Sequence, residues 1–122
     1  MNDSGLNDPG LNDPRAKALF ADVAAIEQQR AQSGKLYNEF LRAPSMSAGL
    51  YVLAVGMTDQ QHPHHEDEMY YVIRGRARFR AGDQDREVSA GSVLFVAAEV
   101  EHRFYDIAEE LAALVFFAPP ES

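Results

Sequence analysis

The residue types best suited to metal chemistry in this chain are its four histidines, three of which lie within a short segment. His62, His64 and His65 stand just before an acidic run that ends at Glu68, and His102 follows later. His62 and His64 are two residues apart, so on an extended segment their imidazoles point to the same face, and the proline between them favours that extended conformation. Imidazole and carboxylate groups are ligands of divalent transition metals. The segment therefore predicts a metal site.

The same segment resembles the first cupin motif, which runs glycine, five residues, His-x-His, three residues, glutamate, six residues, glycine. Five positions match it without a gap: Gly56, His62, His64, Glu68 and Gly75. A later stretch, from Gly91 to His102, is similar to the looser second cupin motif. The resemblance covers about residues 35–118 and implies a metal-ligand set of three histidines and one glutamate: His62, His64, Glu68 and His102.

The second motif departs from the family pattern in one loop. Ala97 and Glu99 stand where the family usually has proline and glycine, and Asp106 stands where it often has asparagine. A positive φ is costly for a glutamate. We therefore expect the 97–101 loop to differ in shape from that of the family, without a consequence for His102.

The ligand set also requires a bend in the chain. Six residues of straight strand would carry Glu68 about 20 Å from His62, whereas the ligands of one ion all lie about 2.1 Å from it. We therefore expect the chain to bend or bulge through 65–67, and His102 to reach the site from a different strand. His65 is expected to be a loop residue outside the ligand set.

Three neutral imidazoles and one carboxylate suit Fe, Mn, Co, Ni, Cu or Zn, and do not discriminate among them. Four protein ligands on an ion that prefers five or six leave positions open for water, oxygen or a substrate. For a cupin, the resemblance implies a metal-dependent dioxygenase acting on a small organic substrate, or a metal-dependent isomerase or decarboxylase. A non-catalytic module that binds a metal or a small molecule is the other alternative. No catalytic residue is assigned beyond the ligands.

The remaining patterns predict how the chain is organised. A repeat of Gly, Asn, Asp and Pro predicts a flexible arm over 1–14, and apolar residues at helical spacing predict an amphipathic helix over 15–34 that ends at Gly34. Short strands follow over 35–118, with a tail at 119–122. The predicted strands are 35–41, 47–55, 69–74, 76–81, 86–89, 92–96, 101–106 and 111–117. This indicates an all-β fold, and the resemblance implies the cupin double-stranded β-helix, a jelly-roll barrel, with one N-terminal helix.

Composition excludes several classes of protein. With 122 residues and 46% hydrophobic content, the chain is long enough for one domain with a core. Its net charge of −8 argues against nucleic-acid binding, and the lack of cysteine excludes disulfides and thiolate metal sites. We see no signal peptide or membrane span, and expect a cytoplasmic protein. The apolar helix stripe favours a homodimer. Alternating arginines at 76, 78 and 80 predict an outer strand face paired with acids.

Overall fold

The computed structural model describes residues 17–122, so the arm predicted at 1–14 lies outside the described residues. Within them, one helix precedes six strands. The elements are α1 (Val23–Ser33), β1 (Tyr37–Ala43), β2 (Met46–Leu53), β3 (Asp67–Ala81), β4 (Gln84–Ser89), β5 (Val93–Val96) and β6 (His102–Ala118). No helix in the described part is long and apolar enough to cross a membrane.

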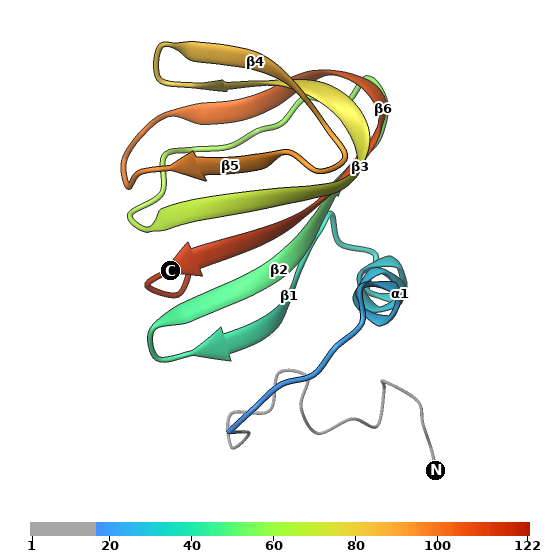
Figure 1. Ribbon diagram of the computed structural model, residues 1–122, viewed down its shortest axis with the longest axis vertical. Coiled ribbons are helices and arrows are strands. Elements are labelled where there is room, and N and C mark those ends of the chain that lie inside the picture. The colour runs from blue at the N-terminus through green and yellow to red at the C-terminus, as the bar shows by residue number, and fades with distance from the viewer. Residues whose placement is uncertain (1–16) are drawn as a thin grey trace.

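The strands form one antiparallel sheet in the order β1-β2-β6-β3-β4, and β5 pairs with β3 as well. Figure 1 shows how the long strands β3 and β6 curve, so that the sheet folds over on itself. β3 pairs with β5 through its first residues, with β4 through its last, and with β6 along most of its length. The prediction of an all-β fold with one helix is confirmed.

Two predicted strand breaks are bulges inside longer strands. The strands expected at 69–74 and 76–81 are one strand, β3, whose register with β6 shifts on both sides of Gly75. Gly75 has φ of 98°, and a Cβ there would clash with the backbone at the carbonyl oxygen of Glu110. The strands expected at 101–106 and 111–117 likewise join in β6. Glycine at position 75 therefore permits β3 and β6 to cross closely, and it does not end a strand.

The predicted helix starts too early. α1 begins at Val23, and residues 17–22 of the expected 15–34 helix are not helical. Asp22 precedes the helix with an extended backbone. Aspartate favours helix N-caps over helix interiors. Phe20 is 83% exposed, so this turn has little apolar burial to stabilise it. The predicted helix end is confirmed, since Gly34 caps α1 with φ of 72°.

The two faces of the sheet bury different clusters. Alternate residues such as Leu53, Tyr70 and Val115 point into the barrel and form its main core. The intervening residues, such as Leu50 and Ala112, form a second cluster on the outer face, which includes Ile26 of α1. α1 lies beside β1 and β2 on this outer face (Figure 1). The inward faces of β2, β3 and β6 are therefore the ones that can build a site.

The outer face of β3 carries the predicted arginine stripe, and the expected acid pairs are present. Arg78 Nη2 lies 3.1 Å from Asp85 Oδ1, and Arg76 Nη1 lies 3.4 Å from Glu87 Oε2, both on neighbouring β4. Arg80 also reaches Asp85, at 3.5 Å. The stripe is an exposed, paired surface, as the sequence predicts.

Candidate metal centre

Three of the four predicted ligands meet at one end of the barrel. Glu68 is the second residue of β3, His102 is the first residue of β6, and His64 lies in the loop before β3. Each offers one ligand atom, and these atoms all lie within 4.8 Å of one another. The chain bends at 65 and 66, just before β3 begins. The predicted bend is therefore present, and it sets His64 beside Glu68.

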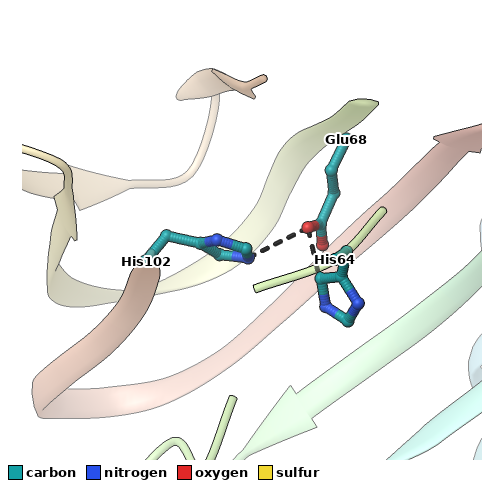
Figure 2. Close-up of side chains that lie close together, drawn as sticks. All are labelled: His64, Glu68 and His102. Atoms are coloured by element: carbon teal, nitrogen blue, oxygen red, sulfur yellow. Dashed lines mark ion pairs between the residues drawn. The ribbon is translucent and has the colours of Figure 1, made fainter. Parts of the chain in front are cut away.

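The Glu68 carboxylate is the centre of this cluster (Figure 2). Its Oε1 lies 2.9 Å from Nε2 of His102 and 3.8 Å from Nε2 of His64. Glu68 and His102 are only 3% and 4% exposed. A carboxylate at this depth is costly unless a cation or several hydrogen bonds compensate its charge.

That compensation is missing among the described residues. Glu68 Oε1 and His102 Nε2 are both buried, and despite their separation neither makes a hydrogen bond of acceptable geometry within residues 17–122. His102 Nδ1 lies 2.8 Å from the carbonyl oxygen of Val100. If Nδ1 donates its hydrogen to that carbonyl, Nε2 of the neutral ring presents a lone pair to Glu68. Two electron-rich atoms then face the same point, as ligands of one cation do.

The surroundings of the His102 ring also shift its pKa. Burial lowers its pKa, but the Glu68 carboxylate and the Val100 carbonyl outweigh this, so the pKa of His102 is raised above its ordinary value. The same contacts that would favour a proton at Nε2 would favour a metal ion there. The donor set therefore fits a divalent ion.

His64 is held by the loop and by the C-terminal segment. Its ring packs edge-on against Phe117, with the ring centroids 5.2 Å apart. Nε2 is 3.2 Å from Oε1 of Gln61, and Nδ1 is 3.9 Å from Oε2 of Glu121. Hydrogen bonds from the Glu121 amide to Ser47 and from Arg42 to the Glu121 carbonyl hold the end of the chain over the site.

The other two histidines lie apart from the cluster. His62 lines the same pocket as His64 and Glu68, but its side chain is exposed and is not among the clustered ligands. His65 is an exposed loop residue whose Nδ1 lies 2.6 Å from Glu99 Oε2. This hydrogen bond raises the pKa of His65 above its ordinary value.

The loop predicted to depart from the family shape keeps a glycine-like backbone. Glu99 has φ of 70°, in the left-handed region that glycine favours. Its amide N–H donates to the carbonyl oxygen of His64 over 2.7 Å, while its side chain reaches His65. Ala98 N–H donates to Asp67 Oδ1 over 2.9 Å. The cost of the positive φ is offset by contacts that join the 97–101 loop to the histidine segment.

Asp59 is a site residue that sequence reasoning missed. It is 3% exposed, and its carboxylate accepts hydrogen bonds from Tyr51 OH over 2.5 Å, Gln61 Nε2 over 2.7 Å and Phe104 N–H over 2.8 Å. It therefore ties the loop before the histidines to β2 and β6. Phe104, whose backbone amide donates to Asp59, is fully buried in the core.

A pocket of about 280 Å³ opens beside the cluster. Its lining combines aromatic and polar side chains from four parts of the chain: Tyr37, Tyr51, Gln60, Gln61, His62, Pro63, His64, Glu68, Tyr70, Val115, Phe117 and Glu121. Burial and the Asp59 hydrogen bond raise the pKa of Tyr51, and burial raises the pKa of Tyr70. These phenols therefore stay protonated. A larger groove of about 430 Å³ between β4 and β5 contains none of the clustered residues. A further pocket of about 380 Å³ is lined by His102 together with Asp59 and Arg80, whereas the 280 Å³ pocket is lined by two of the clustered residues, His64 and Glu68.

Comparison with known proteins shows what the chain is similar to. A family model for the cupin domain matches residues 49–118. The chain is 47% identical over 97 residues to the uncharacterized protein SCO3923 of Streptomyces coelicolor, a match that covers 80% of this chain and 92% of that protein. It is 28% identical over 104 residues to Polyketide synthase CurC of Streptomyces cyaneus, covering 81% of this chain and 68% of that protein.

Solved structures show the same fold. TT1209 from Thermus thermophilus superposes with a TM-score of 0.68 at 22% identity, over 83% of this chain and 97% of that one. An RmlC-like cupin family protein with a double-stranded β-helix fold from Methanocaldococcus jannaschii superposes with a TM-score of 0.63 at 20% identity, over 70% and 80%. The predicted double-stranded β-helix is confirmed.

Proposed function

This chain belongs to the cupin family, and we propose that it binds one divalent transition-metal ion and, beside it, a small organic molecule. The ion would be Fe, Mn, Co, Ni, Cu or Zn. Four side chains would hold it: His62, His64, Glu68 and His102. The observation that carries the proposal is the buried pair of Glu68 Oε1 and His102 Nε2, 2.9 Å apart and without a hydrogen bond in the described chain.

His62 is the ligand that needs a rearrangement. It is exposed at the rim of the pocket, in the loop that also carries His64. Its two-residue spacing from His64 favours the same face of an extended segment. Because His62 lies in a loop and not on a strand, a local change in the conformation of this loop would be enough to bring its imidazole to the ion.

The pocket supports binding of a small molecule that carries oxygen atoms. Its volume, about 280 Å³, lies just below the usual range for ligand pockets, which favours a compact ligand. When bound, the ion would supply a Lewis-acid centre that attracts substrate oxygen. Protonated phenols of Tyr51 and Tyr70 and the amide of Gln61 add polar groups to aromatic walls. The relative named Polyketide synthase CurC supports an oxygen-rich, polyketide-like substrate.

We further propose that the activity is that of a metal-dependent dioxygenase on this substrate class. The four-ligand set supports it, because it leaves positions on the ion free. The alternatives are a metal-dependent isomerase or decarboxylase, and a binding module without turnover.

Elemental analysis of the purified protein, with oxygen uptake measured on a panel of diketones and polyphenols, tests this proposal. We expect close to one ion per chain and substrate-dependent oxygen consumption. The His62→Ala, His102→Ala double variant should lack the ion, and full occupancy in that variant would refute the site. Product formation without oxygen uptake would favour the isomerase or decarboxylase, and ion binding without any turnover would favour the binding module.

A second copy of the chain is the partner we propose. Four exposed apolar side chains form a patch on the outer face of β3 and β5, where Met69 pairs with Phe95 and Tyr71 pairs with Val93. Such a patch is typical of an interface. Light scattering should give the mass of a dimer for the wild type and of a monomer for Phe95→Glu, while Phe20→Glu should remain dimeric. A monomeric wild type would refute this proposal. The cytoplasmic location stays a prediction.

A further inference from the structure

Three tyrosine side chains line the metal-centre pocket, and their hydroxyl groups differ in what they contact. Tyr51 OH donates to Asp59 Oδ1 over 2.5 Å, and Tyr70 OH lies 3.1 Å from Gln61 Nε2. Tyr37 OH is buried and has no hydrogen-bond partner among residues 17–122. A buried hydroxyl without a partner is costly, and such groups are rare in folded proteins.

The fold holds the Tyr37 ring in this position. Tyr37 lies at the start of β1, opposite Tyr51 on β2. Its ring lies against Gly49, where an added Cβ would overlap the ring at Cζ of Tyr37. Tyr51 and Phe117 contact the ring edge-on, with centroids 6.3 and 6.2 Å away. The absence of a side chain at position 49 therefore makes room for this ring, and aromatic neighbours flank it.

The surroundings of the hydroxyl favour its role as a donor. Burial, followed by the charges of Glu121, Glu39 and Glu68, raises the pKa of Tyr37, so the phenol keeps its proton. Glu68 and Glu121 line the same pocket. A ligand that lies between Tyr37 and the metal centre would therefore meet an O–H group on one side and the clustered ligands on the other.

We propose that the Tyr37 hydroxyl determines specificity by donating a hydrogen bond to an oxygen acceptor of the molecule bound beside the metal centre. The inference rests on the proposed function and narrows its substrate class to compact molecules with at least two oxygen atoms, such as β-diketones. At least one oxygen would face the ion, and one would accept the hydrogen bond from Tyr37.

The first test uses the protein loaded with Co(II) and the β-diketone 2,4-pentanedione as a probe, followed by visible absorption under argon. We expect Tyr37→Phe to bind Co(II) like the wild type and to bind the probe about five- to tenfold more weakly, the effect of one lost hydrogen bond. The matched control is Tyr105→Phe, whose hydroxyl is hydrogen-bonded to Asp85 on the outer face, away from the pocket. It should bind the probe with wild-type affinity.

The second test is the thermal unfolding midpoint of the metal-free proteins. Tyr51→Phe breaks a hydrogen bond to Asp59 and should lower the midpoint by a few degrees. Tyr37→Phe removes an unpartnered hydroxyl and should leave the midpoint unchanged or raise it. An equal fall in both variants would show that Tyr37 has a structural partner and would overturn the inference.

The two tests separate the inference from the proposed function. Unchanged probe affinity in Tyr37→Phe would overturn the role of Tyr37 alone. A wild-type protein that binds Co(II) but not the probe would refute the diketone class and the inference with it. A wild-type protein that binds no Co(II) would refute the proposed function itself.

Discussion

Two of the places where charged side chains meet on this barrel are built differently. On the outer face of β3 and β4, Arg78 donates to Asp85 and to Tyr105, and these side chains are partly exposed. Inside the barrel, Glu68 Oε1 and His102 Nε2 are nearly inaccessible and lie close together, and neither atom has a hydrogen bond within residues 17–122. Exposed ion pairs contribute little to stability. The buried carboxylate of the inner cluster needs a cation to balance its charge, whereas the outer pairs do not. This difference is what indicates a binding site.

The largest effect that the comparison predicts is on metal affinity. His102→Ala removes a proposed ligand at the start of β6, and we expect metal affinity to fall on the order of 100-fold or more, beyond the loss typical of supporting residues. Isothermal titration with Co(II) measures it. His65→Ala is the matched control, because this histidine is exposed and hydrogen-bonded to Glu99, and it should retain wild-type affinity. Equal losses in the two variants would remove the distinction between clustered and loop histidines.

An intermediate effect is expected at Asp59, a buried carboxylate that does have its hydrogen bonds. Asp59→Asn replaces an acceptor of three hydrogen bonds by an amide that cannot accept all of them. We expect the free energy of unfolding to fall by about 2 kcal/mol, the contribution of hydrogen bonds to a charged group. Urea denaturation measures this fall.

Asp83→Asn, in the exposed turn after β3, is the matched control for that measurement and should stay near the wild-type value. A wild-type free energy of unfolding in Asp59→Asn would mean that the Asp59 contacts do not stabilise the fold.

The smallest predicted effect is on the thermal midpoint, when Asp85 on the outer face is substituted. The hydrogen bond from Tyr105, followed by those from Arg78, lowers the pKa of Asp85 below its ordinary value of 3.8. A carboxyl whose pKa is lowered by folding stabilises the protein above its unfolded-state pKa, and this contribution is lost as pH falls through the folded-state pKa. The thermal midpoint of Asp85→Asn should therefore lie slightly below that of the wild type near neutral pH.

The gap between these midpoints should close as pH falls below about 4, where the unfolded-state carboxyl takes up its proton. A difference in midpoint that stays constant from neutral to acid pH would show that the Asp85 charge does not contribute to stability. Metal affinity at neutral pH should be the same in both proteins.

The resemblance to the cupin motifs predicted which side chains would gather, including His102 from a distant strand. The bend before β3 followed from the spacing between the histidines and Glu68. His64, Glu68 and His102 meet as expected, His62 does not join them, and metal binding by these four residues stays a prediction. Tyr37, Asp59 and Glu121 were missed because their places at the site depend on how segments distant in the chain come together. Tyr37 reaches the pocket only through the pairing of β1 with β2, and Glu121 only because the chain end returns over Ser47.

The errors in the predicted elements have a similar cause. Apolar residues at helical spacing before Val23 predicted a longer helix, although Phe20 remains exposed. Gly75 suggested a strand end, yet its freedom in φ serves a crossing of β3 with β6. The helix start and the continuity of β3 both depend on which residues lie opposite in the folded chain, and local periodicity does not encode this.

The central place of β3 has a consequence for how fast an ion could exchange. Because β3 pairs with β4, β5 and β6, its backbone amides should exchange hydrogen with solvent only when the whole barrel opens. The backbone at Glu68 is therefore expected to move away from the site only when the whole barrel unfolds. His62 and His64 lie in a loop outside the strand ladders. We expect the rates of ion entry and release to follow the motion of that loop.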